Sequence, residues 1–147
     1  MKTRVNIKKL DSRATVPTYG SEYAAGADLY ALLDEPLCIK PNETAFVHTG
    51  LALELPLGYA GLVYARSGLA SKRDLAPANK VGVIDCDYRG EIIVSLHNHG
   101  VKEQTIENGE RIAQLVITPY ITADFEECEE LSDTVRGEGG FGSTGKK

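Results

Sequence analysis

The segment Thr44-Ala-Phe-Val-His-Thr-Gly-Leu-Ala-Leu-Glu-Leu55 alternates between apolar and polar residues, and its clearest apolar positions are Phe46, Leu51, Leu53 and Leu55. Successive side chains of a strand point to opposite faces, so this alternation predicts a long β-strand with one buried face. Shorter runs rich in β-branched residues predict further strands at residues 59–64, 81–84, 91–96 and 111–117. Turn residues separate these runs at regular intervals. The pattern predicts an all-β fold, either a sandwich or a jelly roll.

Only residues 67–72 are predicted to form a helix, a short one with Ser67 as a candidate N-cap. Residues 124–133 carry many carboxylates and little apolar content, which is typical of a solvated linker. We therefore expect a β-barrel domain at residues 1–118, an acidic linker at 119–135 and a flexible glycine-rich arm at 136–147. At ~3.3 Å per extended residue, the linker can carry the arm tens of ångströms, far enough to reach a neighbouring subunit.

The composition is that of one ordinary globular domain. The chain has 147 residues, 42% hydrophobic and 25% charged, which is enough for one hydrophobic core. The formal net charge of −5 argues against a protein that coats nucleic acid, although a few local arginines can still bind a small phosphorylated ligand. Three widely spaced cysteines fit reduced thiols in the cytoplasm better than disulfides or a zinc site. The sequence has neither a signal-peptide pattern nor a membrane-length apolar run.

The C-terminal stretch Arg136-Gly-Glu-Gly-Gly-Phe-Gly-Ser-Thr-Gly145 has a composition suited to phosphate binding. Glycines let backbone N–H groups point into one concavity, hydroxyls add donors, and an arginine fork matches phosphate geometry. Phe141 has no core to join within this stretch, but its ring can stack on a base. The segment is therefore a candidate cap that closes over a nucleotide. Taken alone, it is also compatible with a disordered glycine-rich tail.

The stretch Val81-Gly-Val-Ile-Asp-Cys-Asp-Tyr-Arg-Gly-Glu91 predicts a strand, a turn and a returning strand. Asp85 and Asp87 fall in this turn, where aspartates normally hydrogen-bond their own backbone. The alternative is functional, because a hairpin mouth with two carboxylates and a tyrosine can hold a planar base. The backbone edge of such a hairpin presents N–H and C=O groups that can recognise the base by its donors and acceptors.

Three further segments carry weaker signals. Ala65-Arg66-Ser-Gly-Leu-Ala70 joins a strand to the predicted helix, so it is either an ordinary capped turn or an anion site built from backbone N–H groups, Arg66 and Ser67. Gln114, in a predicted core strand, is either a satisfied amide or a phosphate ligand. Asp28 is either a turn or strand-end aspartate, or an oxygen ligand for Mg²⁺ or for a metal-bound water.

Taken in order, five motifs closely resemble those of the trimeric dUTPase family. They are Ala-Gly-Ala-Asp-Leu-Tyr-Ala (25–31), Arg-Ser-Gly-Leu-Ala (66–70), Gly-Val-Ile-Asp-Cys-Asp-Tyr-Arg-Gly-Glu (82–91), Gly-Glu-Arg-Ile-Ala-Gln-Leu (109–115) and the C-terminal stretch. The resemblance implies a jelly-roll-like β-barrel that forms a homotrimer, with three subunits sharing each site. It also implies Mg²⁺-dependent hydrolysis of dUTP to dUMP and pyrophosphate, which keeps uracil out of DNA and supplies dUMP for dTMP synthesis.

The resemblance also implies roles for individual residues. Asp85 would activate the attacking water and contact the 3′-hydroxyl, and Tyr88 would pack under the deoxyribose and exclude a 2′-hydroxyl. The uracil would be recognised by the hairpin backbone near Val83, Ile84 and Ile93 and by the Asn79 side chain. Phosphates would be held by Arg66, Ser67 and Gly68, with Gln114 near the α-phosphate.

In the same family pattern, Asp28 would help to hold the metal, through water. The closing arm would contribute Arg136, Phe141, Gly142, Ser143 and Thr144, with the ring over the uracil and the loop on the γ-phosphate. One position departs from the usual pattern, since Ala65 stands where the family often has proline before its Arg-Ser-Gly motif. Proline would stiffen that turn, but its loss removes no ligand.

Two other functions remain compatible with these residues. A dUTP-gated regulator would keep the binding residues without needing catalysis, and the intact Asp85 argues against it. A dCTP deaminase-like enzyme shares the barrel, but the complete Asp-Tyr-Arg-Gly-Glu hairpin and the Phe-Gly-Ser-Thr end favour dUTP hydrolysis.

Overall fold

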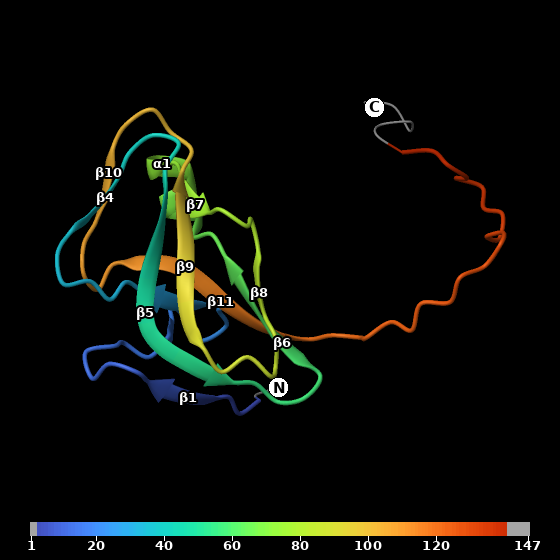
Figure 1. Ribbon diagram of the computed structural model, residues 1–147, viewed down its shortest axis with the longest axis horizontal. Coiled ribbons are helices and arrows are strands. Elements are labelled where there is room, and N and C mark those ends of the chain that lie inside the picture. The colour runs from blue at the N-terminus through green and yellow to red at the C-terminus, as the bar shows by residue number, and fades with distance from the viewer. Residues whose placement is uncertain (1–2, 141–147) are drawn as a thin grey trace.

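The computed structural model describes residues 3–140, which form eleven β-strands and one short helix (Figure 1). The strands are β1 (Asn6–Lys9), β2 (Thr18–Tyr19), β3 (Ala27–Tyr30), β4 (Leu37–Ile39), β5 (Thr44–Glu54), β6 (Tyr59–Tyr64), β7 (Leu75–Pro77), β8 (Gly82–Ile84), β9 (Glu91–Asn98), β10 (Gln104–Ile106) and β11 (Arg111–Pro119). Two larger sheets have the orders β1-β5-β9-β7 and β2-β3-β11-β6-β8, and β10 pairs with β4. The all-β prediction is confirmed, and the antiparallel sheets agree with a jelly-roll-like β-barrel. None of the helices in this described part has the length and apolar character needed to span a membrane.

The two larger sheets share one hydrophobic core. Val47 of β5 and Leu96 of β9 enter it from one sheet, while Leu29 of β3 and Ile112 of β11 enter from the other, and all four are fully buried. Figure 1 shows β5 and β9 running side by side in front of β11. Burial of this apolar surface is the main favourable contribution to folding, at roughly 25 cal/mol per Å².

The five predicted strands are all present, but the predicted burial of Phe46 is wrong. Its side chain is 69% exposed, whereas the neighbouring Val47 is fully buried. A strand has a side-chain period of two, so the residues on one face are all odd-numbered or all even-numbered. Leu51 and Leu53 face the core, and Phe46 is out of phase with them. Val47 is the core residue at this end of β5.

The helix α1 (Ser67–Arg73) agrees closely with the predicted one, but its N-cap does not. Arg66 occupies the cap position and makes no side-chain capping bond, while Ser67 is the first helical residue. Leu69 anchors the helix in the core at 6% exposure. At the other end, the Arg73 Nε donates to the Gln104 Oε1 at 3.1 Å. The helix is thus fixed at both ends, which fixes the position of Arg66.

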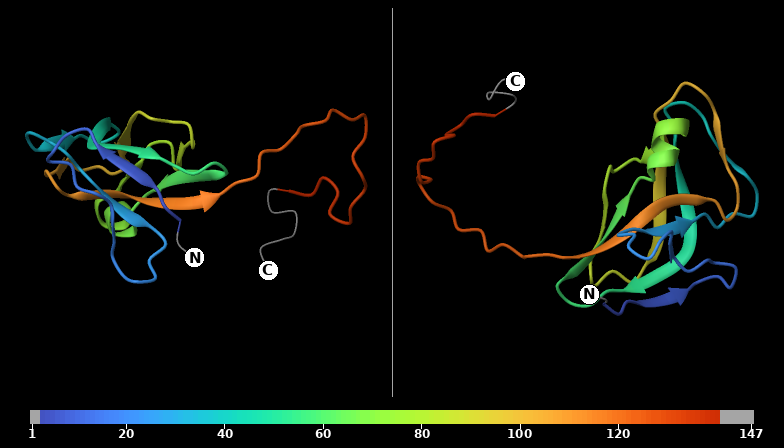
Figure 2. Two further views of the ribbon diagram at one scale, coloured as in Figure 1. Left: turned by 90° about the horizontal axis from the view of Figure 1, so that it is seen from below. Right: turned by 180° about the vertical axis from the view of Figure 1, so that it is seen from behind.

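Beyond β11 the chain leaves the barrel. Between residues 120 and 140 it forms no helix or strand, and Figures 1 and 2 show it extending away from the sheets. Apolar side chains on it, such as Ile121 and Phe125, are 95% and 93% exposed. The strand β11 continues to Pro119, one residue past the predicted end of the barrel domain.

Asn98 is a fully buried polar residue at the end of β9. Its Nδ2 donates to the carbonyl oxygens of Ile39 (2.9 Å) and Lys102 (2.7 Å), and its Oδ1 accepts from the Gly100 N–H (2.9 Å). One amide therefore ties β9 to β4 and to the loop that follows β9. These main-chain partners are buried or partly buried. If the Asn98 amide is removed, neither water nor another protein group takes its place as their hydrogen-bond partner.

We predict that Asn98→Ala lowers the free energy of unfolding by about 3 kcal/mol, because it removes three hydrogen bonds and strands their partners. Urea denaturation of the parent and the variant measures this difference. Asn6→Ala is a suitable control, since Asn6 is exposed and its Nδ2 donates one hydrogen bond to the Glu54 carboxylate at 2.8 Å, so it tests an asparagine outside the buried network. A loss below about 0.5 kcal/mol for Asn98→Ala would contradict the assigned role.

Candidate active site

A cavity of about 250 Å³ lies between β8 and β9. Six of the residues predicted to bind the nucleoside line it, namely Asn79, Val83, Ile84, Asp85, Tyr88 and Ile93. Its other lining residues are Val63, Pro77, Gly82, Glu91, Ile92, Val94 and Ser95. Ligand pockets commonly measure roughly 300–1,000 Å³, so this cavity suits a ring system better than a whole triphosphate.

A free backbone edge borders the cavity. Within residues 3–140, β8 pairs only with β6 and ends the order of its sheet, while β9 belongs to the other sheet. The predicted hairpin is therefore wrong, because the turn at Asp85 joins two strands that do not pair with each other. Main-chain N–H and C=O groups on the other edge of β8 are therefore available to a ligand. A Cβ atom on Gly82 would lie 3.1 Å from the Asn79 Nδ2, so the amide of Asn79 packs directly against the start of this strand. Donors and acceptors at fixed spacing thus line one wall.

The turn between β8 and β9 carries Asp85. The Tyr88 N–H donates to the Asp85 carbonyl at 3.2 Å and closes the turn. The Arg89 Nη1 donates to the carbonyls of Cys86 (2.7 Å) and Tyr88 (3.1 Å), so the guanidinium holds the outer side of the turn. Asp85 is exposed and lines the cavity, so its carboxylate is accessible to water and to a ligand.

The ring of Tyr88 is fixed in two ways. Its hydroxyl donates to the Glu91 carbonyl at 3.0 Å. The ring also lies over Gly90, because a Cβ atom at that position would come within 2.4 Å of the Tyr88 hydroxyl oxygen and 2.5 Å of its Cζ. Tyr88 is still 47% exposed, so a broad apolar surface remains for a ligand at the cavity mouth.

The start of the linker, at Tyr120, touches the same turn. The Tyr120 hydroxyl lies 3.6 Å from the Cys86 Sγ, and the Tyr120 N–H donates to the Gly58 carbonyl at 3.0 Å. The hydrogen bond with Cys86 raises the pKa of the Tyr120 phenol above its usual value. The direction in which the arm leaves the barrel is thus set next to Asp85.

A second cluster surrounds Asp28 on β3. The Asp28 Oδ1 accepts from the Arg66 Nε at 2.8 Å, and its Oδ2 accepts from the Arg111 Nη1 at 3.2 Å. Only 12% of the Asp28 side chain is exposed, compared with 25% for Arg66 and 51% for Arg111. One buried carboxylate therefore orients two arginines, and their exposed groups form a local positive surface on an acidic protein.

Gln114 on β11 has a structural partner. Its Nε2 donates to the Ala65 carbonyl at 2.8 Å, and its side chain packs against Gly26, where a Cβ atom would lie 2.4 Å from the Gln114 Oε1. The amide therefore holds the turn that precedes Arg66. The acceptor is a main-chain carbonyl, which proline would also supply, so Ala65 preserves this contact.

The predicted site residues fall into two groups that this single chain does not join. Among residues 3–140, none of Arg66, Ser67, Gly68 and Gln114 lines the cavity between β8 and β9. Arg136 lies on the arm, where its Nε donates to the Gly139 carbonyl at 2.8 Å. Phe141, Gly142, Ser143 and Thr144 lie outside the described residues.

The fold and both groups of residues agree with one family. The family model described as dUTPase matches residues 12–145. The chain belongs to the dUTPase family. It is 50% identical to the deoxyuridine 5'-triphosphate nucleotidohydrolase of Nautilia profundicola, with 97% of this chain and 99% of that protein covered.

Two solved phage dUTPases share the fold. The dUTPase of Staphylococcus bacteriophage 80alpha, in complex with dUPNHPP, has a TM-score of 0.89 and 31% identity, covering 98% of this chain and 99% of that one. A mutant dUTPase from phage phi11 of S. aureus, in which coordination of a structural Mg(II) ion is described, has a TM-score of 0.78 and 26% identity, covering 87% and 98%.

Sequence reasoning missed several residues of the dUTPase cavity. Ser95 lies two residues beyond Ile93 on β9, so the period of a strand would have placed it on the same face. Pro77 offers no such signal, because it reaches the cavity through the pairing of β7 with β9. Arg111 was also missed as a partner of Asp28, since the two residues are far apart in the sequence.

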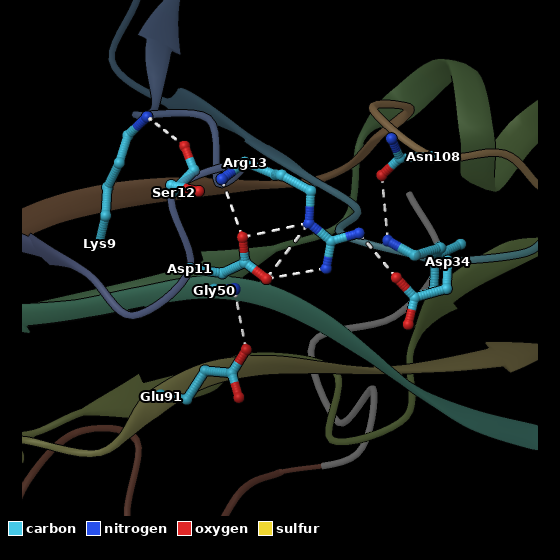
Figure 3. Close-up of polar contacts among 9 residues, drawn as sticks. Lys9, Asp11, Ser12, Arg13, Asp34, Gly50, Glu91 and Asn108 are labelled. Atoms are coloured by element: carbon cyan, nitrogen blue, oxygen red, sulfur yellow. Dashed lines mark hydrogen bonds and ion pairs between the residues drawn. The ribbon is translucent and has the colours of Figure 1, made fainter.

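Glu91 is the last residue of the motif at residues 82–91, and its carboxylate accepts two hydrogen bonds. Its Oε1 accepts from the Gly50 N–H at 2.8 Å, as Figure 3 shows, and its Oε2 lies 2.9 Å from the His48 Nδ1. Burial raises the pKa of the Glu91 carboxyl, but the bonds to His48 and Gly50 outweigh burial and leave the pKa below its usual value of 4.5.

A carboxyl whose pKa is lower in the folded state stabilises that state at higher pH, because the unfolded chain binds the proton more tightly. Its contribution is complete well above pH 4.5 and is lost as the pH falls below that value. We therefore predict that the stability gap between the parent and Glu91→Gln narrows as the pH falls from about 6 to about 3. Urea denaturation across this range measures the gap. A gap that stays constant would contradict the assigned pKa shift.

Proposed function

We propose that this chain hydrolyses dUTP to dUMP and pyrophosphate, at a site assembled from neighbouring subunits of a homotrimer. The observation that carries the proposal is the cavity between β8 and β9, with Asp85 and Tyr88 among its lining residues and a free backbone edge along one wall, in a chain of the dUTPase family. This combination can bind a base, pack against a sugar and activate a water. Three free cysteines in the chain fit a cytoplasmic enzyme.

The cavity suits a uracil nucleoside. The edge of β8 near Val83 and Ile84 offers N–H and C=O groups to the donors and acceptors of the base, and Asn79 adds an amide. Ile93 is 42% exposed and supplies an apolar surface for the ring. Tyr88 packs under the deoxyribose, where a 2′-hydroxyl would meet its ring.

The phosphates bind at the second cluster. Arg66, with the Ser67 hydroxyl and the Gly68 backbone beside it, faces an anion, while Gln114 holds the turn in place and contacts the α-phosphate region. Asp28 fits Mg²⁺ through water, since each of its oxygens accepts one guanidinium N–H and a carboxylate offers roughly four lone-pair sites. Mg²⁺ neutralises phosphate charge when bound, and it is usually held by substrate phosphates and few carboxylates.

Asp85 acts as the general base. Its exposed carboxylate takes a proton from a water, the oxygen of that water attacks the α-phosphorus, and the bond from the α-phosphorus to the bridging oxygen of the β-phosphate breaks. Pyrophosphate leaves with the bond electrons. Arg136 and the stretch from Phe141 to Thr144 close the site, exclude bulk water and bind the γ-phosphate.

Sharing between subunits is supported by the separation of the two groups of residues. The base cavity and the Arg66 cluster do not share one pocket of the described chain. The arm leaves the barrel and extends away from it (Figure 2). A neighbouring copy can bring the missing group to each cavity, whereas a single chain leaves the base side and the phosphate side apart.

The direct test is pyrophosphate release from dUTP, dCTP, dTTP and UTP, assayed side by side with Mg²⁺. We expect release from dUTP and little from the other three. Binding of dUTP without pyrophosphate release would instead support a dUTP-gated regulator. That alternative is relevant because the phage 80alpha dUTPase is described as controlling transfer of virulence genes. Ammonia release from dCTP would support a deaminase.

We predict that Asp85→Asn removes most turnover but keeps the fold and dUTP binding, because asparagine matches the shape of aspartate but cannot take the proton. A positioned general base contributes typically 10²–10⁴-fold, so kcat should fall by at least about a hundredfold. Steady-state kinetics measure the loss of turnover, and a separate binding measurement checks that dUTP still binds. Asp87→Asn is the matched control in the same turn. Turnover of Asp85→Asn within about tenfold of the parent would remove Asp85 from this role.

The arm predicts rescue between two defective proteins. One carries Asp85→Asn with an intact arm, and the other keeps Asp85 but is truncated before Arg136. Each alone should be nearly inactive. When trimers assemble at random from equal amounts, about a quarter of all sites receive Asp85 from one chain and an arm from another, since each independent contribution is right half the time.

The controls for this experiment are the two proteins refolded separately and then combined. Mass spectrometry of the intact assemblies verifies that mixed trimers form. If the arm served the cavity of its own chain, no mixed trimer would contain a complete site. Activity equal to the sum of the separate proteins, in verified mixed trimers, would therefore overturn the shared-site proposal.

A further inference from the structure

We propose that Glu91 is a positioning residue for sugar discrimination, acting through Tyr88. Its carboxylate secures the start of β9 across an interruption of the β5–β9 ladder, and the main chain so fixed holds the Tyr88 ring in place. The inference rests on the proposed function, because it assigns to Glu91 the precision with which that site separates dUTP from UTP.

The first step is the interruption itself. His48 pairs with Ile93 and Ala52 pairs with Glu91, so the register shifts between these two pairs. Residues 49–51 therefore cannot continue the regular ladder. Gly50 sits at the centre with a φ of 67°, a conformation that glycine adopts without steric cost. Glu91, the first residue of β9, pairs with Ala52 at the far edge of this irregular stretch.

The second step is how the Glu91 side chain replaces the missing ladder bonds. It accepts from the Gly50 N–H at 2.8 Å and contacts the His48 Nδ1 at 2.9 Å. One carboxylate thus satisfies a main-chain donor in the bulge and links it to a strand residue before the bulge. Only 23% of the Glu91 side chain is exposed, so water can replace these bonds only in part. Figure 3 shows the Gly50 bond beneath the Asp11–Arg13 loop.

The third step leads from Glu91 to Tyr88. The Tyr88 hydroxyl donates to the Glu91 main-chain oxygen at 3.0 Å, and the ring rests on Gly90, where an added Cβ atom would lie 2.4 Å from the Tyr88 hydroxyl oxygen and displace the ring. Both contacts depend on where the chain at residues 90–91 lies. A shift of the Glu91 backbone therefore moves the ring or releases its hydroxyl. Exclusion of a 2′-hydroxyl depends on contact distances, so a displaced ring discriminates less well.

Three variants test the inference. Glu91→Ala removes both carboxylate bonds, and Glu91→Gln keeps an acceptor for Gly50. Tyr88→Phe keeps the ring but loses the bond to the Glu91 oxygen. The quantity measured is the ratio of kcat/KM for dUTP to kcat/KM for UTP. We expect Glu91→Ala to lower this ratio on the order of tenfold, since small misplacements of site groups have effects of this size or larger. Glu91→Gln should stay within about threefold of the parent.

A double-mutant cycle strengthens the test. If Glu91 acts through the Tyr88 hydroxyl, Tyr88→Phe should lower the same ratio, and the double variant should lower it no further than the larger single effect. Glu43→Ala is the matched control. The Glu43 carboxylate also accepts a main-chain N–H, from Lys40 at 3.2 Å, but it lies next to the opposite end of β5. The ratio of kcat/KM for dUTP to kcat/KM for UTP should be the same in Glu43→Ala as in the parent.

The outcomes are distinct. A folded Glu91→Ala whose dUTP/UTP ratio stays within about twofold of the parent would overturn the inference, as would a fall of both kcat/KM values by one common factor. If Glu91→Ala does not fold, Glu91→Asp decides, because its shorter side chain cannot reach both partners and its ratio must fall. A parent that releases no pyrophosphate from dUTP would instead refute the proposed function itself.

Discussion

The break in the β5–β9 ladder around Gly50 is the constraint on which much of the structure depends. Gly50 has a φ of 67°, and a Cβ atom there would lie 2.9 Å from that of Ala14 and 2.6 Å from the Leu32 Cδ2. Its N–H is bound by Glu91 and its carbonyl by the Leu10 N–H at 2.8 Å. Gly50 therefore joins three parts of the structure, which are the N-terminal loop, the long strand β5 and the β-strand that follows the Asp85 turn.

The division of the site follows from the topology of the sheets. The turn between β8 and β9 joins the edge of one sheet to the interior of the other, and the cavity lined by Asp85 and Tyr88 lies at this junction. Arg66 stands at the start of α1, beyond β6, beside Asp28 of β3. Each group is rigid because strands or packed side chains hold it. In the proposed function, association of subunits completes the site without loosening either part.

The sequence predicted five of the strands and six residues that line one cavity, because both depend on local pattern. Alternation located β5, and the turn motif located Asp85 and Tyr88. Two failures are local, the N-cap at Arg66 and the missed cavity residue Ser95, while the others involve partners that are distant in the chain. Phe46 looked like a core residue until Leu51 and Leu53 fixed which face is buried. The two arginines on Asp28 come from other strand ends, and no spacing in the sequence relates all three. The resemblance to a known family supplied the roles, while the contacts came only from the fold.

The charge arrangement explains how an acidic protein can accept a highly charged anion. The net charge is −5, so long-range attraction does not favour a triphosphate, and screening leaves only charges within roughly 10 Å effective. Within the Asp28 cluster, one carboxylate stands against the guanidinium groups of Arg66 and Arg111, so these three side chains together carry a net charge of +1. The Asp28 carboxylate weakens the positive electrostatic field of the cluster but fixes the orientation of both guanidinium groups. Binding of an anion then depends on the orientation of these guanidinium groups more than on total charge, and in the proposed function the arm and Mg²⁺ supply the rest of the neutralisation.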